Sequence, residues 1–145
     1  MLDNGDLIQL SEAFIQYTYT KNRPISEGGV ERTTSYYLGK IIVTVFAEDG
    51  TVKWSKSIDR IQAPRRIRRA EMFIQDGLIC VPYMEDESAY LRTYDIKTGA
   101  KKSKSLKIEK GFTIIPSLTI RLDDHTFFIV QEKSKKFIVG QIVFE

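Results

Sequence analysis

The stretch that decides the fold is VTVFAEDGTVKWSKSI, residues 43–58. Two runs in which apolar and polar residues alternate lie on either side of the pair Asp49-Gly50. A period of two is typical of a β-strand, because successive side chains of a strand point to opposite faces. An Asp-Gly pair between two such runs is typical of a hairpin turn. The stretch therefore predicts an antiparallel β-hairpin, in which Lys56 is the one polar residue on the apolar face of the second strand.

Runs of the same kind, rich in Tyr, Phe, Val, Ile and Thr, recur along the chain. Turn residues separate them at Asp76-Gly77, Thr98-Gly99 and Asp123-Asp124. A chain of 145 residues suits one domain. We therefore predict a single all-β domain over residues 1–145, an antiparallel meander of about ten strands.

Three segments depart from this simple pattern. Residues 6–17 fit either a strand or an amphipathic helix, and the β-rich Tyr and Thr residues that follow favour a strand. Residues 21–35 contain Pro24 and Gly28-Gly29 and little apolar content, which predicts a long loop. Residues 59–66, around Pro64, predict a second loop.

An internal repeat appears when the turns are aligned. The segment LRTYDIKTGAKKSKSL (91–106) repeats the strand, acidic residue, Gly turn and Lys/Ser-rich strand of residues 43–58. A third copy begins in KKFIVGQIVFE (135–145) and ends where its turn would come. The expected units are 1–58, 69–107 and 117–145. A unit of about 40–50 residues has the size of a propeller blade.

These residues carry a resemblance to a known class of repeat. The segment VFAEDGTVKWSKSI resembles the strand–turn–strand of β-propeller repeats that have an Asp-Gly turn and an outgoing Trp. Together with KKFIVGQIVFE, it is similar to segments of uncharacterised bacterial envelope or secreted proteins with propeller-like repeats. The resemblance implies propeller-like blades; a compact barrel or sandwich is the alternative, because a propeller closes with about four or more blades.

The same resemblance implies a cellular compartment for the chain but no catalytic or ligand-binding activity. It favours a bacterial protein in the periplasm, at the cell surface or secreted. Separately, the turn signal Asn4-Gly5-Asp6 so close to the start favours a fragment of a longer protein to which Met1 was added. The residues alone leave the compartment unknown. The resemblance implies no catalytic residue, cofactor or ligand.

Candidate catalytic and metal-binding groups are sparse. The chain has one His and one Cys, whereas a metal site needs several ligands that converge. Cys80 lies in the apolar run LICVPY, where an inert buried thiol is expected. Asp124 and His125 are neighbours, and neighbours on a strand point to opposite faces. We therefore predict no enzyme activity, no metal and no cofactor.

Basic residues gather in two segments although the net charge is only +3. In an extended strand 65–69, alternate Arg side chains point to opposite faces, so they form no continuous stripe and nucleic-acid binding is not expected. The segment 60–69 is interpreted as a solvated linker between two repeat units. An anionic partner is the alternative, and its candidate residues are Arg60, Arg65, Arg66, Arg68, Arg69, Lys101, Lys102 and Lys104.

Aromatic residues supply the other candidate contacts. Tyr36, Tyr37 and Trp54 follow or lie near the expected loop 21–35. Flat amphipathic rings can bind a peptide or carbohydrate, or they can pack in the core. Tyr36 and Tyr37 point to opposite faces if they lie in a strand, so at least one is expected to be exposed.

The sequence thus predicts a non-catalytic structural or interaction domain whose partner is another protein or the rest of its own parent chain. A polyanion-binding module that uses residues 60–69 and 97–110 is the first alternative, and an enzyme domain with an unrecognised site is the second. No apolar run approaches the length of a membrane-spanning helix, so no membrane span is expected.

Overall fold

The computed structural model describes residues 2, 4–22, 24, 26, 28–60, 69–85, 88–108, 110–123 and 126–143. Within these residues the protein is all-β, with ten strands in three antiparallel sheets. This confirms the predicted fold class. None of the three sheets closes on itself, because each has two different edge strands, so the expectation of a compact barrel is wrong.

Each sheet is formed by strands that are consecutive in the chain. Sheet A has the order β1-β2-β3, sheet B the order β4-β5-β6-β7, and sheet C the order β10-β9-β8. Their bounds are β1 (Leu7–Asn22), β2 (Val30–Phe46), β3 (Val52–Ile58), β4 (Phe73–Gln75), β5 (Leu78–Glu85), β6 (Ser88–Asp95), β7 (Lys101–Leu106), β8 (Thr113–Arg121), β9 (Thr126–Lys133) and β10 (Lys136–Val143).

The Asp49-Gly50 turn lies where the sequence predicts it. It joins β2 to β3, and the Asp49 carboxylate accepts hydrogen bonds from the backbone N–H and the hydroxyl of Thr51, at 2.9 and 2.7 Å. Gly50 has a φ of +83°, which a residue with a side chain rarely adopts. The local chemistry of two residues therefore accounts for this hairpin.

The segment 21–35 is mostly strand, contrary to the predicted loop. β1 runs to Asn22 and β2 begins at Val30. Thr33 and Thr34 pair with Tyr19 and Thr18, so the β-forming residues after the turn extend the ladder. Pro24 and Gly28-Gly29 mark only the connection itself. Of the predicted loop 59–66, residues 61–66 lie outside the described part of the chain.

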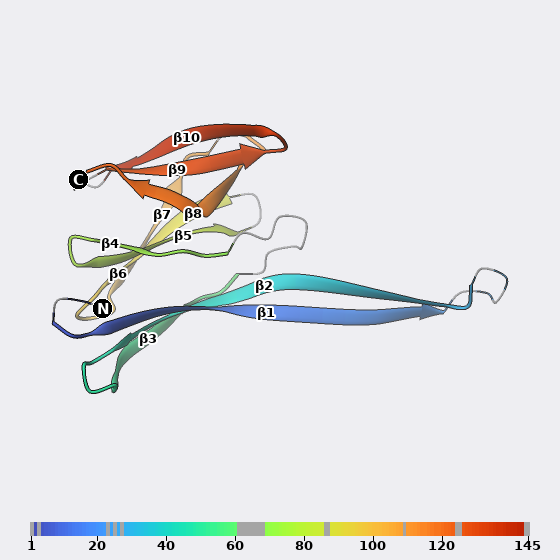
Figure 1. Ribbon diagram of the computed structural model, residues 1–145, viewed down its shortest axis with the longest axis horizontal. Coiled ribbons are helices and arrows are strands. Elements are labelled where there is room, and N and C mark those ends of the chain that lie inside the picture. Colours follow the sequence, from blue (N-terminus) through green and yellow to red (C-terminus); the bar gives the residue numbers. More distant parts are fainter. Residues whose placement is uncertain are drawn as a thin grey trace.

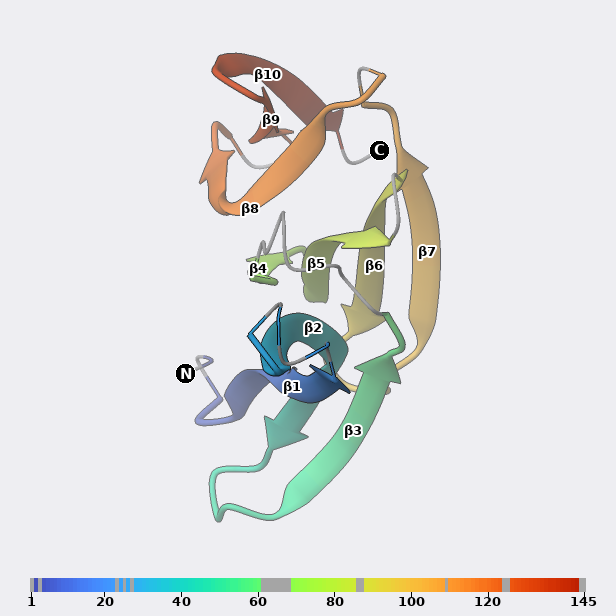
Figure 2. The same ribbon diagram turned by 90° about the vertical axis from the view of Figure 1, so that its right-hand side faces the viewer.

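The three sheets are stacked as layers in the order A, B, C (Figure 2). β5 lies in the middle layer and is buried on both faces. Its residues Ile79, Val81 and Tyr83 belong to the core shared with sheet A, and Cys80 and Met84 belong to the core shared with sheet C. Because strand side chains alternate, one strand serves two hydrophobic cores.

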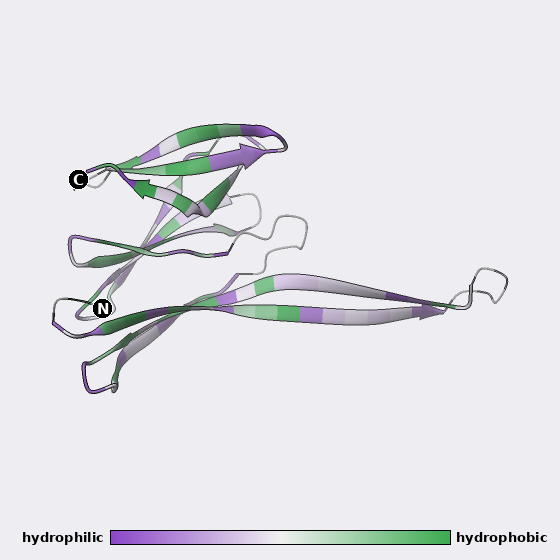
Figure 3. Ribbon diagram, viewed as in Figure 1, coloured by the Kyte–Doolittle hydropathy of each residue, from purple (hydrophilic) through white to green (hydrophobic). Residues whose placement is uncertain are grey.

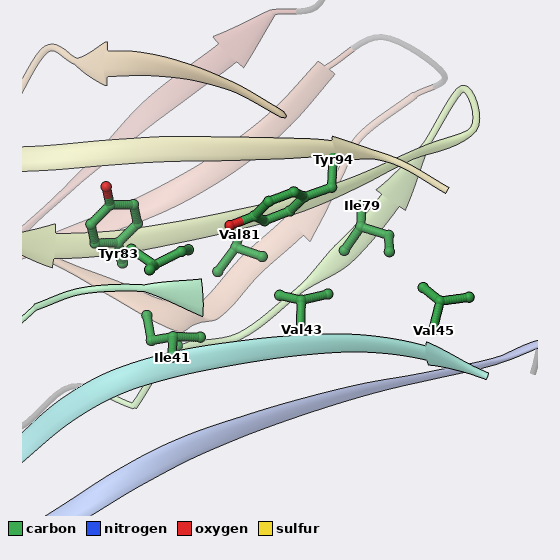
Figure 4. Packing of buried hydrophobic residues seen from close by; sticks show 9 residues of the cluster. Ile41, Val43, Val45, Ile79, Val81, Tyr83 and Tyr94 are labelled. Atoms are coloured by element: carbon green, nitrogen blue, oxygen red, sulfur yellow. The ribbon is translucent and has the colours of Figure 1, made fainter. Parts of the chain in front are cut away.

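The core between sheets A and B forms from the inner face of β2. Ile41, Val43 and Val45 alternate along β2 and face Ile79 and Val81 of sheet B (Figure 4). The five side chains are fully buried. On the other side of sheet B, Leu91 of β6 meets the inward-facing residues of sheet C, which are Ile114, Phe127, Ile129 and Ile142.

The β1–β2 hairpin extends well beyond the stack, as the long blue (β1) and cyan (β2) ribbons in Figure 1 show. β3 pairs with β2 only over the residues between Ile41 and Phe46. We call the part of the hairpin beyond this region, residues 13–22 and 30–40, the arm. Within the arm, most side chains on both strands are exposed or half-buried, since no other sheet covers them.

Candidate functional site: the basic and aromatic surfaces

Arg60 lies in the interior and is held by Glu12. Its guanidinium donates to the Glu12 carboxylate, and the same carboxylate oxygen accepts the backbone N–H of Ala70 at 3.2 Å. The Arg60 side chain is completely buried, and burial lowers its pKa to about 10, so it stays charged at neutral pH. Glu12 therefore holds both ends of the connection between sheets A and B, Arg60 at its start and Ala70 at its end. Because the Arg60 side chain is buried, a dissolved anion does not reach it. This corrects its assignment as an anion-binding residue.

Arg69 is the other arginine of the segment that lies within the described residues. Arg69 is exposed and lines a cavity of about 460 Å³ with Glu12, Phe14, Leu38 and Ala70 at the base of the arm. Arg65, Arg66 and Arg68 lie outside the described residues. Because Glu12 and Glu71 also line this cavity, its walls carry both signs of charge.

The lysines of β7 lie on both faces of sheet B. Lys104 pairs with Leu91, which faces sheet C, and Lys101 pairs with Tyr94, which faces sheet A. Lys102 and Lys104 therefore share one face. They line a groove of about 340 Å³ between β7 and the end of β10, together with Thr93. The three lysines that were predicted as one group thus separate into a pair and a single residue.

Trp54 connects sheets A and B. Its indole N–H donates to the backbone carbonyl of Ile96 at 2.8 Å, and its ring lies 5.8 Å from that of Tyr94. A Cβ added at Gly99 would lie 3.0 Å from the indole, so the glycine leaves room for the ring. Trp54 is half-buried and packs between sheets A and B, so of the two roles considered for it the structure shows packing in the core.

Tyr36 and Tyr37 lie in β2 on opposite faces of the arm. The Tyr36 ring stacks on Phe14 with centroids 5.5 Å apart, and the Tyr37 ring meets Tyr17 edge-on at 5.6 Å. Both partners come from β1, as does the exposed Tyr19. Phe14, Tyr17 and Tyr19 were not predicted as contact residues, although the alternation of AFIQYTYT was a usable signal.

The outer face of sheet C is a second exposed surface, and it was not predicted from the sequence. On β10, Phe137, Val139 and Val143 point away from sheet B and are 61%, 64% and 49% exposed. Val139 pairs with Val130 and Ile115 pairs with the same residue, so apolar side chains run across all three strands. Figure 3 shows the apolar stretches along β8, β9 and β10.

The single cysteine has the environment of a structural thiol. Cys80 is fully buried, and desolvation, with a further contribution from the charge of Asp76, raises its pKa to about 12. A nucleophilic cysteine needs the opposite shift and some exposure. Asp124 and His125, the other pair considered, lie outside the described residues.

No group of three or more His, Cys, Asp or Glu side chains among the described residues is arranged to hold a metal ion. Nor does this part of the chain contain a helix that is long and apolar enough to cross a membrane.

Comparison with protein-family models, with curated proteins and with solved structures finds no match for this chain. The chain's own surfaces are therefore the basis on which a function is inferred.

Proposed function

We propose that the chain is a non-catalytic structural or interaction domain made of propeller-like sheets, and that it docks a further β-sheet on the outer face of sheet C. The observation that carries the proposal is the exposure of Phe137, Val139 and Val143 on β10. The further sheet belongs either to another protein or to the rest of a longer parent chain.

The layers already in the protein support this choice of partner. Sheet B has apolar side chains on both faces, and a neighbouring sheet covers each face. The outer face of sheet C also has apolar side chains, with Val130 and Val139 opposite each other at its centre. Stacked sheets lie about 10 Å apart and interdigitate such side chains, so another sheet fits this face by the geometry the protein already uses twice.

The two ends of the stack differ in chemistry. On the outer face of sheet A, Gln9, Thr44 and Ser55 lie side by side, and the hydroxyl groups of Thr44 and Ser55 are 3.0 Å apart. Leu7 and Ile42, which are 47% and 37% exposed, flank this polar row on the same face. A polar row across the middle of a face remains hydrated at little cost, whereas the middle row of sheet C, Ile115, Val130 and Val139, is apolar on all three strands and marks an interaction site. The partner sheet is therefore expected at sheet C and not at sheet A.

Photo-crosslinking in cells of the source organism tests the proposal. A benzophenone amino acid replaces Val139 on the outer face of sheet C, and in a control it replaces Ser55 on the outer face of sheet A. We expect residue 139 to crosslink to a strand-forming peptide of another protein or of the parent chain, as identified by mass spectrometry. No crosslink at residue 139, or equal crosslinking at residue 55, would overturn the proposal.

A polyanion-binding function is the second candidate, favoured by the shared face of Lys102 and Lys104 beside the β7–β10 groove. Two ammonium groups on one face attract a sulfated or phosphorylated chain with an affinity that falls as salt rises. We expect the double substitution Lys102→Ser with Lys104→Ser to lower the salt concentration that elutes the protein from heparin. Lys101→Ser, on the opposite face, is the control. Retention on heparin no stronger than on a neutral resin would exclude this function.

A further inference from the structure

The arm has two unpaired edges. Over its length β1 pairs only with β2, and β3 begins to pair with β2 at Ile41, after the arm ends. No other strand of the described chain pairs with either edge. Each edge therefore presents a row of backbone N–H and C=O groups that another strand could bind.

An isolated two-stranded ribbon is marginally stable in water, and three or more strands are normally needed. This ribbon also exposes aromatic rings on both faces. Phe14 is 61% exposed on one face, and Tyr17 is 57% exposed on the other. Stacking of a partner on one face would leave the other face exposed, whereas an added strand at an edge gives both sets of rings a new neighbour.

The two edges differ in composition. In β1, residues 13–20 (AFIQYTYT) contain no charge, no proline and no glycine, and they are rich in aromatic and β-branched side chains. In the β2 half of the arm the corresponding uncharged run is shorter, residues 33–38 (TTSYYL), and it is bounded by Glu31 and Arg32 on one side and by Gly39 and Lys40 on the other. Edge strands normally carry charges or proline that prevent pairing, and an uncharged β-prone segment that lacks them favours it. The β1 edge is therefore the one suited to a partner strand.

We propose that two copies of this chain associate by antiparallel pairing of their β1 edges, which gives a four-stranded ribbon in the order β2-β1-β1′-β2′. The occupant is a second copy because the uncharged segment 13–20 is complementary to itself. This inference is independent of the proposed docking on sheet C. The two-fold axis runs perpendicular to the ribbon, so residues that share a face are placed opposite each other.

The charges agree with this arrangement. The uncharged segment is centred on Gln16 and Tyr17, so the axis passes beside residue 16, 17 or 18. Lys21 of one copy then lies opposite one of residues 11–15 of the other copy and not opposite the other Lys21. Because the strands run antiparallel, the two stacks lie at opposite ends of the ribbon, and the extension of the arm beyond the stack (Figure 1) keeps them apart.

Disulfide trapping tests the pairing and its position. Neighbouring strands are about 5 Å apart, which suits a disulfide, whereas the two outer β2 strands of the ribbon are about 14 Å apart. We expect at least one of Gln16→Cys, Tyr17→Cys and Thr18→Cys to form crosslinked dimers under mild oxidation. Ser35→Cys, which lies opposite Tyr17 on β2, is the matched control and should stay uncrosslinked. Cys80 is left in place because it is fully buried.

Sedimentation velocity over a concentration series provides the second measurement. The unaltered chain should show a dimer that dissociates on dilution, and Gln16→Lys with Thr18→Lys should shift it to monomer by placing like charges around the axis. Thr33→Lys with Ser35→Lys, on β2, should leave the dimer intact, and circular dichroism verifies the fold of each variant. A monomer at every concentration, or crosslinking through Ser35→Cys as readily as through β1, would overturn the proposal without affecting the test at Val139.

Discussion

At the scale of single residues, Arg60 brings a charge into the interior and Glu12 is the acid that accepts its hydrogen bond. Removing one partner of a buried pair leaves an uncompensated charge, which costs far more than the pair contributes. We predict that Glu12→Gln lowers the free energy of unfolding by about 3 kcal/mol, as measured in urea.

The exposed pair Lys40–Asp59, at 3.0 Å with side chains 52% and 81% exposed, is the control. Lys40→Gln should change the stability by less than about 1 kcal/mol. Equal effects of the two substitutions would contradict the role given to Glu12.

We predict that Gly99, the turn glycine beside Trp54, tolerates replacement by alanine less well than Gly50 does. Gly99 has a φ of +67°, and a Cβ there would lie 3.0 Å from the indole, whereas Gly50 has a φ of +83° and nothing within 4 Å of its Cβ position. Gly50→Ala should therefore cost only the left-handed strain, about 1 kcal/mol. Gly99→Ala should cost at least about 1 kcal/mol more, because the indole must move. Thermal denaturation of both variants measures the difference, and a smaller effect at Gly99 would count against the packing of Trp54.

At the scale of elements, the turn between β6 and β7 depends on Asp95. Its carboxylate accepts hydrogen bonds from the backbone N–H and the hydroxyl of Thr98 and from the backbone N–H of Lys97, all at 2.8 to 3.0 Å. These bonds, those from Thr98 first, lower the pKa of Asp95 below its usual 3.8.

A carboxylate whose pKa is lowered by folding contributes stability above the unfolded-state pKa, and that stability is lost as the pH falls through the folded-state pKa. We predict that the melting temperature of Asp95→Asn falls less than that of the unaltered protein between about pH 5 and about pH 2. The same slope in both proteins would show that the turn does not depend on the charge.

The arm is predicted to be dispensable for the folding of the stack. Phe14 stacks on Tyr36 and Thr18 bonds to Thr34, so the ring and hydroxyl contacts of the arm join its own two strands. Replacing residues 17–35 by Asn-Gly leaves Gln16 and Tyr36 paired around a two-residue hairpin turn. We expect the free energy of unfolding to change by less than about 1 kcal/mol. A large loss of stability would mean that the arm contributes to the core, and loss of the dimer alone would agree with pairing through β1.

At the scale of the whole molecule, the middle sheet couples the two cores. Trp54, the only tryptophan, reports on the interface between sheets A and B, whereas Ile129 lies in the core between sheets B and C. β5 contributes to both cores, so unfolding should be cooperative.

We predict that Ile129→Ala lowers the stability by about 3 kcal/mol and shifts the transition seen by Trp54 fluorescence as much as that seen by circular dichroism. Ile138, partly buried on the same face of sheet C, supplies a milder comparison as Ile138→Val. If the tryptophan transition stays in place while the circular dichroism transition splits, sheet C unfolds independently and the stack is not one cooperative unit.

The sequence by itself determined the strands and the tight turns. The Asp49-Gly50 hairpin and the alternating runs depend on contacts between near neighbours, which a pattern of a few residues encodes. The burial of Cys80 was also predictable, because the side chains of a continuous apolar strand are normally buried in a hydrophobic core. The extent of β1 and β2 was underestimated, since the glycines and Pro24 of the connection outweighed the β-forming residues on either side.

Only the tertiary structure decided which charges and rings are exposed. Arg60 was grouped with the arginines that follow it in sequence, yet it is paired with Glu12, 48 residues earlier. For Trp54 the sequence left a surface contact and core packing open, and its partners Ile96 and Gly99 come from the β6–β7 turn of another sheet. Alternation gives the face on which a side chain lies, but the sheet that covers that face is set by the order of stacking. That order places sheet B between two cores, and no other described strand covers the outer face of sheet C or the β1 edge of the arm.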